Sequence, residues 1–121
     1  MSKFSKIAKA ATTLSPVMEN RTKIDTREII DEFPNGITVN ECDLVSTIEG
    51  SYAIVSFSEL SDRFYNCGSL LTNIVTEWVK EYDGDIEACN ADLKASGGVK
   101  IVLEESKTAS GRNFTKVTII D

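Results

Sequence analysis

Residues 69–82 read SLLTNIVTEWVKEY, and their apolar side chains recur every three or four positions. This spacing is typical of one face of an amphipathic α-helix. Ser69 precedes the first apolar residue and suits the N-cap, because its hydroxyl can accept a hydrogen bond from an unpaired backbone N–H. Asp83 and Gly84 follow, and glycine commonly ends a helix. Since strand-like stretches lie on both sides, we expect this helix to cover a small β-structure.

Five stretches predict β-strands, because they are rich in β-branched and aromatic residues or alternate between apolar and polar. They are residues 37–47, 52–57, 63–67, 99–103 and 114–120. In the first stretch the apolar positions are odd up to Val39 and even from Cys42 onward. This slip of one residue indicates a β-bulge near residues 40–41, which would bend the strand as a barrel requires.

Two shorter helices are predicted as well. Thr26 is the expected N-cap of a helix over residues 26–33, and Asp85 caps another that reaches residue 95. Residues 1–23 have no clear period, and Ser15-Pro16 interrupts them. A short basic helix docked on the protein, a solvated tail and an arm that contacts DNA all fit this segment.

Three strands, a helix and two more strands follow one another in the order of an OB-fold, a five-stranded Greek-key barrel. We therefore predict a mainly β protein with helices (α+β), with the long helix between the third and fourth strands. Residues 34–121 would form the OB-fold domain. Residues 1–33 would form a basic N-terminal extension with a short helix.

The composition indicates one ordinary globular domain. The chain has 121 residues, of which 41% are hydrophobic and 26% charged. We find no apolar run long enough to cross a bilayer and no signal-peptide pattern, so we expect a cytoplasmic protein. Three widely spaced cysteines and no histidine argue against a disulfide framework, zinc ligand sets and Ser-His or Cys-His catalysis. We therefore expect no catalytic residues, no metal and no cofactor.

Charge is unevenly distributed along the chain, whose net charge is −6. Residues 1–27 hold six Lys or Arg against two acids, whereas residues 28–98 hold three against fourteen. Residues 99–121 hold four against three. An acidic protein can still bind nucleic acid, because a local basic surface decides such binding.

An OB-fold binds its ligand on its second and third strands and between the loops that join strands one to two and four to five. Rings there can stack on bases, and cations can pair with phosphates. Phe64 and Tyr65 point to opposite sides of their strand, and we expect Tyr65 to face outward. The predicted nucleic-acid-binding residues are Tyr52, Phe57, Arg63, Tyr65, Lys107, Arg112 and Lys116. The alternative reading is that these rings pack in the core and that the hairpin charges are simply solvated.

From residue 33 onward several short stretches stand in a recognisable order: PNGITV (34–39), YAIVSF (52–57), CGSL (67–70), VKIVL (99–103), SGR (110–112) and the strand over 114–120. In this order the chain resembles the small single-stranded-DNA-binding proteins of tailed phages that infect Gram-positive bacteria. The resemblance is one of element order and turn placement, and no single motif in it is diagnostic. The resemblance implies a protein that coats single-stranded DNA during phage or prophage replication in the host cytoplasm, without catalysis or metal. It implies single-stranded DNA, replication proteins and further copies of itself on DNA as partners, and no membrane.

Another function remains open on charge alone. A small acidic phage protein can present carboxylates where a host nucleic-acid-binding or defence protein expects phosphates, and so inhibit it by DNA mimicry. The fourteen acids of residues 28–98 are the feature that suggests this reading. Acids gathered on one face would favour mimicry, and dispersed acids would indicate only solubility.

Overall fold

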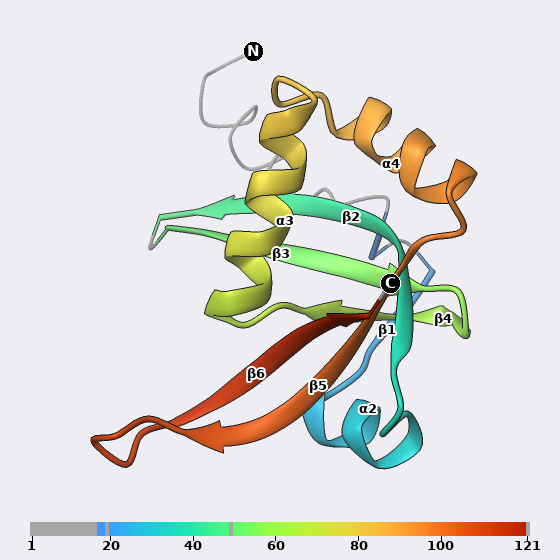
Figure 1. Ribbon diagram of the computed structural model, residues 1–121. Coiled ribbons are helices and arrows are strands. Elements are labelled where there is room, and N and C mark those ends of the chain that lie inside the picture. The colour runs from blue at the N-terminus through green and yellow to red at the C-terminus, as the bar shows by residue number, and fades with distance from the viewer. Residues whose placement is uncertain (1–16, 19, 49, 121) are drawn as a thin grey trace.

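The computed structural model describes residues 17–18, 20–48 and 50–120, which form six strands and three helices (Figure 1). The strands are β1 (Thr22–Lys23), β2 (Ile37–Thr47), β3 (Gly50–Phe57), β4 (Leu60–Asn66), β5 (Val99–Lys107) and β6 (Asn113–Ile120). The helices are α2 (Thr26–Glu32), α3 (Ser69–Glu81) and α4 (Ile86–Ala95). Each of the five expected strands and three expected helices is present, with shifted ends, and β1 is an additional strand.

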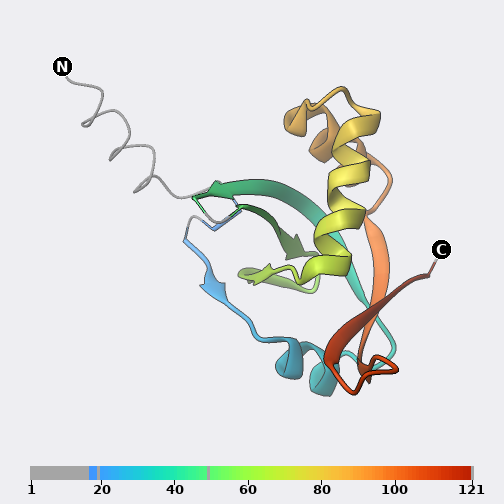
Figure 2. The same ribbon diagram turned by 90° about the vertical axis from the view of Figure 1, so that its left-hand side faces the viewer.

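The strands form a single sheet in the order β1-β4-β3-β2-β5-β6. Neighbours are antiparallel except for β1, which runs parallel to β4. Figure 2 shows the sheet curled into a half-barrel, with the β5–β6 hairpin projecting from it. α3 lies against β2 and β3, and α4 lies beside β2 (Figure 1). None of the helices formed by the described residues is long and apolar enough to cross a membrane.

A bulge in β2 is what bends the sheet. The strand pairs with β5 through Ile37–Val39 and with β3 from Val39 onward, and its register shifts between Val39 and Glu41. The bulge predicted near residues 40–41 is therefore confirmed. It compensates for the slip in the sequence pattern, because Val39 and Cys42 are both fully buried in one core.

The prediction of five strands is wrong, because β1 adds a sixth. Thr22 and Lys23 are both exposed and too few to show any alternation, so no pattern marks them as a strand. Their strand exists because they pair with Arg63 and Phe64 of β4, and Ile24 then donates its N–H to the Phe64 carbonyl at 2.8 Å. Within the described residues β1 and β6 are the two edges of the sheet.

α3 covers the core as its periodicity predicted. Leu71, Val75 and Val79 are buried on its inner face. The N-cap is Gly68 instead of Ser69, and no side chain caps this end. At the other end the Gly84 N–H donates to the Val79 carbonyl at 3.0 Å, which satisfies one of the last helical acceptors.

The segment before β2 packs on the same core. Ile24 and Ile29 are each only 1% exposed and belong to the core cluster of the sheet. Asp25, not the expected Thr26, is the N-cap of α2. The Thr26 hydroxyl instead shares a hydrogen bond of 2.6 Å with the Tyr65 hydroxyl. The three interpretations of residues 1–23 fall mainly on residues 1–16, which lie outside the described part of the chain.

Three cysteine thiols lie in the core. Cys42, Cys67 and Cys89 are unpaired and buried, as expected for inert thiols. Burial raises the pKa of Cys42 from 9.0 to about 12, because the thiolate would lose its hydration. Burial raises the pKa of Cys67 as well, with a smaller contribution from the nearby Cys42 thiol. Both groups are therefore held in the neutral thiol form at neutral pH.

Gly98 lies directly before β5, at a point where the chain packs closely against the bulged strand β2. Its φ is +89°, and a Cβ there would lie 2.6 Å from the Val39 carbonyl oxygen and 2.6 Å from Thr38 Cγ2. Gly97 has a similar φ of +87° but open space around it. We expect Gly97→Ala to lower the free energy of unfolding by about 1 kcal/mol through backbone strain alone. Gly98→Ala should lower it by about 3 kcal/mol, because a steric clash adds to the strain. Urea unfolding measures both, and equal losses would show that β5 can move away from Val39.

The buried thiols predict a loss of stability at alkaline pH. Above pH 9.0 the unfolded chain releases its thiol protons while Cys42 and Cys67 keep theirs in the folded state. The unfolded state then binds fewer protons, so the free energy of unfolding must fall as pH rises. We expect Cys67→Ala to reduce the slope of this fall by about 1 kcal/mol per pH unit between about pH 9 and 10.5. Urea unfolding below pH 8, where the thiol is neutral in both states, is the control, and identical alkaline slopes would contradict the burial argument.

Candidate nucleic-acid interface

Two of the aromatic residues predicted to bind nucleic acid belong to the core. Phe57 is fully buried and Tyr65 is 4% exposed, with ring centroids 6.3 Å apart. Tyr65 is paired with Val55 across β3 and β4, so it lies on the inner face of the sheet. The expectation that Tyr65 faces outward is therefore wrong, and neither ring can stack on a base. Neighbouring residues of a strand point to opposite faces of the sheet, so a difference of one position decides whether a ring is buried or exposed.

The outer face of β3 and β4 carries Tyr52 and Phe64. Both rings are partly exposed, whereas Ile54 and Ser56 between them are buried. The Ser56 hydroxyl donates to Asn40 Oδ1 at 2.9 Å. Tyr52 is thus the one predicted ring that remains accessible on this face, and Phe64 takes the place expected for Tyr65.

Part of the chain before β1 lies over this outer face. Arg21 donates to Glu41 Oε1 at 3.2 Å and to the Ser61 carbonyl oxygen at 3.1 Å. Glu41 Oε1 also accepts from the Ser56 hydroxyl at 3.2 Å. These contacts bridge from β2 to the start of β4, so the face on which an OB-fold would hold its ligand is narrowed by the protein's own chain.

Arg63 has a structural role. Its guanidinium donates to the carbonyl oxygens of Thr22, at 3.2 Å, and Lys23, at 2.8 Å. It also pairs with Glu28 Oε2 at 3.4 Å. These bonds fasten β1 to β4 and leave the side chain engaged within the protein. The predicted nucleic-acid contact of Arg63 is therefore replaced by a structural role between β1 and β4.

The β5–β6 hairpin presents the remaining predicted cations. Lys107, Arg112 and Lys116 are all exposed, and Lys100 lies at the start of the same hairpin. Its loop is closed by the Thr108 N–H, which donates to the Arg112 carbonyl at 2.8 Å. Figure 1 shows this hairpin extending away from the body of the protein. The hairpin therefore offers positive charge on a surface that a long polymer can reach.

The two faces of the hairpin differ in chemistry. Phe114 and Lys116 are alternate residues of β6 and share its outer face, next to the loop that carries Arg112. Phe114 is partly exposed, so a ring stands between two cations along the strand. The inner face carries Glu105 and Lys107, which pair in register with Thr115 and Asn113.

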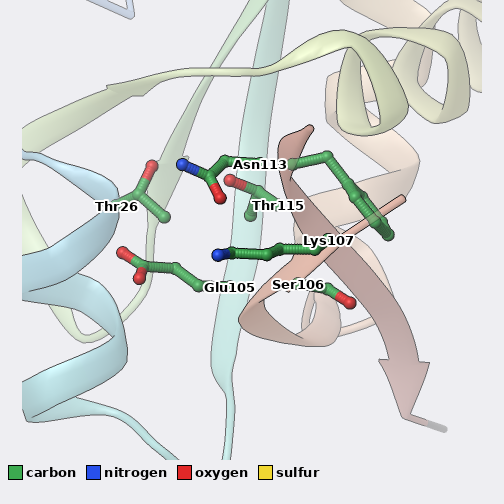
Figure 3. A pocket seen from close by; sticks show the side chains of 7 residues that line it. Thr26, Glu105, Ser106, Lys107, Asn113 and Thr115 are labelled. Carbon is green, nitrogen blue, oxygen red and sulfur yellow. The ribbon is translucent and has the colours of Figure 1, made fainter. Parts of the chain in front are cut away.

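A hollow of about 460 Å³ opens at the inner face of the hairpin, beside the first residue of α2. Figure 3 shows the side chains of Thr26, Glu105, Lys107, Asn113 and Thr115 arranged around it. Glu105 also pairs with Arg27 at 3.6 Å. No sequence pattern identified this hollow, because its lining comes from α2 and from two strands that only the register brings together. The alternation of Phe114 with Lys116 along the strand is a signal that could have identified Phe114, which is not among the predicted nucleic-acid-binding residues.

Acidic side chains gather at the opposite end of the protein. Glu81, Asp83, Asp85, Glu87 and Asp92 are exposed around the C-terminal end of α3 and on α4. Tyr82 donates its hydroxyl to Asp92 Oδ2 at 2.7 Å. Figure 1 shows this end of α3 and α4 far from the tip of the β5–β6 hairpin. The protein therefore has an acidic pole and a basic hairpin.

No group of three or more His, Cys, Asp or Glu side chains in residues 17–18, 20–48 and 50–120 could hold a metal ion. Comparison of the chain with protein-family models, with curated proteins and with solved structures found no match in any of the three.

Proposed function

We propose that this protein binds and coats single-stranded DNA, largely independently of sequence, through its β5–β6 hairpin. The observation that carries the proposal is the outer face of β6, where the half-buried ring of Phe114 stands between the exposed cations Arg112 and Lys116. Phosphates can pair with the two cations while a base stacks on the ring between them. Because every base has an aromatic face, such contacts tolerate any sequence.

The strand pairing supports a barrel of the OB type. β2 pairs with both β3 and β5, β3 pairs with β4, and β5 pairs with β6. α3 lies between the third and fourth of these strands, as in an OB-fold. We propose that this barrel differs from a closed OB-fold in having one open side. On that side β1 pairs with the edge of β4, where a closed barrel would continue.

The separation of charge supports the same function in an acidic protein. With the acids of α3 and α4 at one end, a strand can lie along the hairpin without approaching them. Long-range repulsion from a net charge of −6 would slow the encounter, and the local cations would still hold the bound strand. We place this activity in phage or prophage DNA replication, with replication proteins and further copies of this protein as partners.

One observation favours a second function, inhibition of a host protein by DNA mimicry. Five exposed acids gather at the α3–α4 end, and the nearby Lys80 and Lys94 are themselves engaged with Glu77, at 3.3 Å, and Glu41, at 3.6 Å. This end therefore presents carboxylates with little compensation, as a mimic of phosphates would. The mimic needs no affinity for DNA, which separates the two functions experimentally.

Salt dependence tests the coating function. We expect a fluorescein-labelled oligothymidine of about 15 residues to bind, and its affinity to fall as salt rises from about 50 to 200 mM. The double variant Arg112→Ala/Lys116→Ala removes two phosphate contacts. The slope of log K against log salt should then fall in magnitude by about 1.4, and affinity at low salt by about tenfold. Fluorescence anisotropy measures both quantities.

The matched control is Lys80→Ala/Lys94→Ala, which removes the same charge at the acidic end of the protein. It should leave the slope unchanged, because only cations that meet phosphate release counterions. Equal effects of the two double variants would mean that net charge, not the hairpin, governs binding. No binding of the wild-type protein even at low salt would reject coating and leave the mimic as the better proposal.

Phe114→Leu tests stacking separately from charge. Leucine keeps an apolar side chain on the hairpin but offers no aromatic face to a base. We expect affinity for the oligothymidine to fall about tenfold, while the salt slope stays that of the wild type. Unchanged affinity would contradict stacking on Phe114, and a loss of both affinity and slope would show that Phe114 supports the fold of the hairpin, which thermal unfolding of the variant checks directly.

A further inference from the structure

The hollow beside α2 is built differently from the outer face of the hairpin. Glu105 and Lys107 are alternate residues of β5, so they share one face, and their partners across the ladder are Thr115 and Asn113. The four side chains thus form a two-by-two polar array, with a carboxylate next to an ammonium along one strand. Thr26 of α2 lies beside the array (Figure 3), and its hydroxyl is turned to Tyr65, with which it shares a hydrogen bond of 2.6 Å.

The charge of the hollow suits part of an anionic polymer. One ammonium, that of Lys107, and one carboxylate, that of Glu105, line the hollow, and Arg27 adds a positive charge outside the lining through its pair with Glu105. Arg27 meets Glu105 Oε2 at 3.6 Å, and both side chains are more than half exposed, at 67% and 56%. Such an exposed pair is weak, so ligand donors can compete for the carboxylate. A volume of about 460 Å³ accommodates a flat heterocycle but is too small for a folded domain.

We infer that this hollow is a base-reading subsite that prefers guanine. The inference rests on the proposed function, because it assigns the hollow to one nucleotide of the strand bound by the hairpin. Guanine offers two adjacent donors, N1–H and the exocyclic N2 amino group, and next to them the acceptor O6. The Glu105 carboxylate accepts from the two donors, and the Lys107 ammonium donates to O6. The Asn113 amide can both donate and accept at the rim of the same base.

The other bases match this array less well. Thymine presents a single N–H between two carbonyl oxygens, so one carboxylate oxygen of Glu105 would face an acceptor. Adenine and cytosine each offer an amino group but no second N–H beside it, and neither places an oxygen acceptor next to two donors. Leaving a polar group unpaired is costly, and this cost produces the discrimination.

The position of the hollow connects it to the hairpin. Phe114 contributes to the lining of the hollow and also lies on the outer face of β6 with Lys116. A strand that stacks one base on Phe114 can therefore turn a neighbouring base toward Glu105 and Lys107. A free guanine nucleotide has the same base edge, so the experiment must separate these two sources.

Competition anisotropy with matched oligonucleotides tests the inference. The probes are an oligothymidine of about 15 residues, the same strand with one central guanine, and the same strand with hypoxanthine in that place. We expect the guanine strand to bind about tenfold more tightly than oligothymidine. Hypoxanthine lacks the N2 amino group, so the hypoxanthine strand should lose most of the advantage that the guanine strand has over oligothymidine. This comparison tests the amino group without any change to the protein.

Glu105→Gln should reduce the ratio of guanine to thymine affinities to about one. The matched control is Glu104→Gln, which removes the same charge one residue away on the opposite face of β5 and should keep the ratio near tenfold. Salt-dependent binding of oligothymidine without any preference for guanine would overturn this inference and leave the proposed function standing. A ratio that Glu105→Gln does not change would also overturn it.

Titration with guanosine monophosphate completes the test. Binding of this nucleotide by a protein that binds no oligonucleotide would assign the hollow to free nucleotides and reject the coating function. Failure to bind either the nucleotide or any oligonucleotide would overturn both proposals. Tighter binding of the guanine strand than of the mononucleotide supports both proposals, because the hairpin then contributes to the same complex.

Discussion

The bend of β2 is the constraint on which the rest of this structure depends. One strand pairs with β5 at its beginning and with β3 along the remainder, and the bulge between Val39 and Glu41 lets it do both. Without the extra residue, either Val39 or Cys42 would point away from the core, although both are fully buried. The bend also sets the direction of β5, and so determines where the β5–β6 hairpin leaves the protein.

Close packing at this bend leaves room only for backbone. Gly98 approaches the Val39 carbonyl so closely that a Cβ would not fit, and it does so directly before β5 begins. α4 is held to the same region, because Asn90 donates to the Cys42 carbonyl at 2.9 Å and accepts from the Cys42 N–H at 2.8 Å. An amide side chain therefore satisfies backbone groups that the bulge would otherwise leave without partners.

The open side of the half-barrel is where this protein departs most from a simple barrel. β1 and Arg63 fasten the segment before α2 to the edge of β4, and α2 begins beside the inner face of the hairpin. A polar hollow results at the place where a fully closed sheet would be continuous. The proposed base subsite uses this hollow, whereas the proposed coating contacts lie on the outer face of β6.

Charge separation lets one small acidic protein support two different readings of its function. Four exposed cations, Lys100, Lys107, Arg112 and Lys116, lie on β5, β6 and their loop, whereas Arg21 and Arg63 are engaged within the protein. The acids of α3 and α4 lie at the other end (Figure 1). The coating proposal places a polyanionic partner on the hairpin, and the mimicry proposal places a cationic one at the α3–α4 end.

Local patterns in the sequence were sufficient for every element except β1, for the bulge in β2 and for the cap of α4 by Asp85, which accepts from the Ala88 N–H at 3.1 Å. These features depend on residues within one or two turns or strand pairs of each other. Only the tertiary structure decided that Tyr65 faces inward, that Arg63 fastens β1, and that Thr26 meets the inner face of the hairpin. Each of these depends on which strands become neighbours and in which register, and pairing between distant segments leaves no periodic trace in either partner alone.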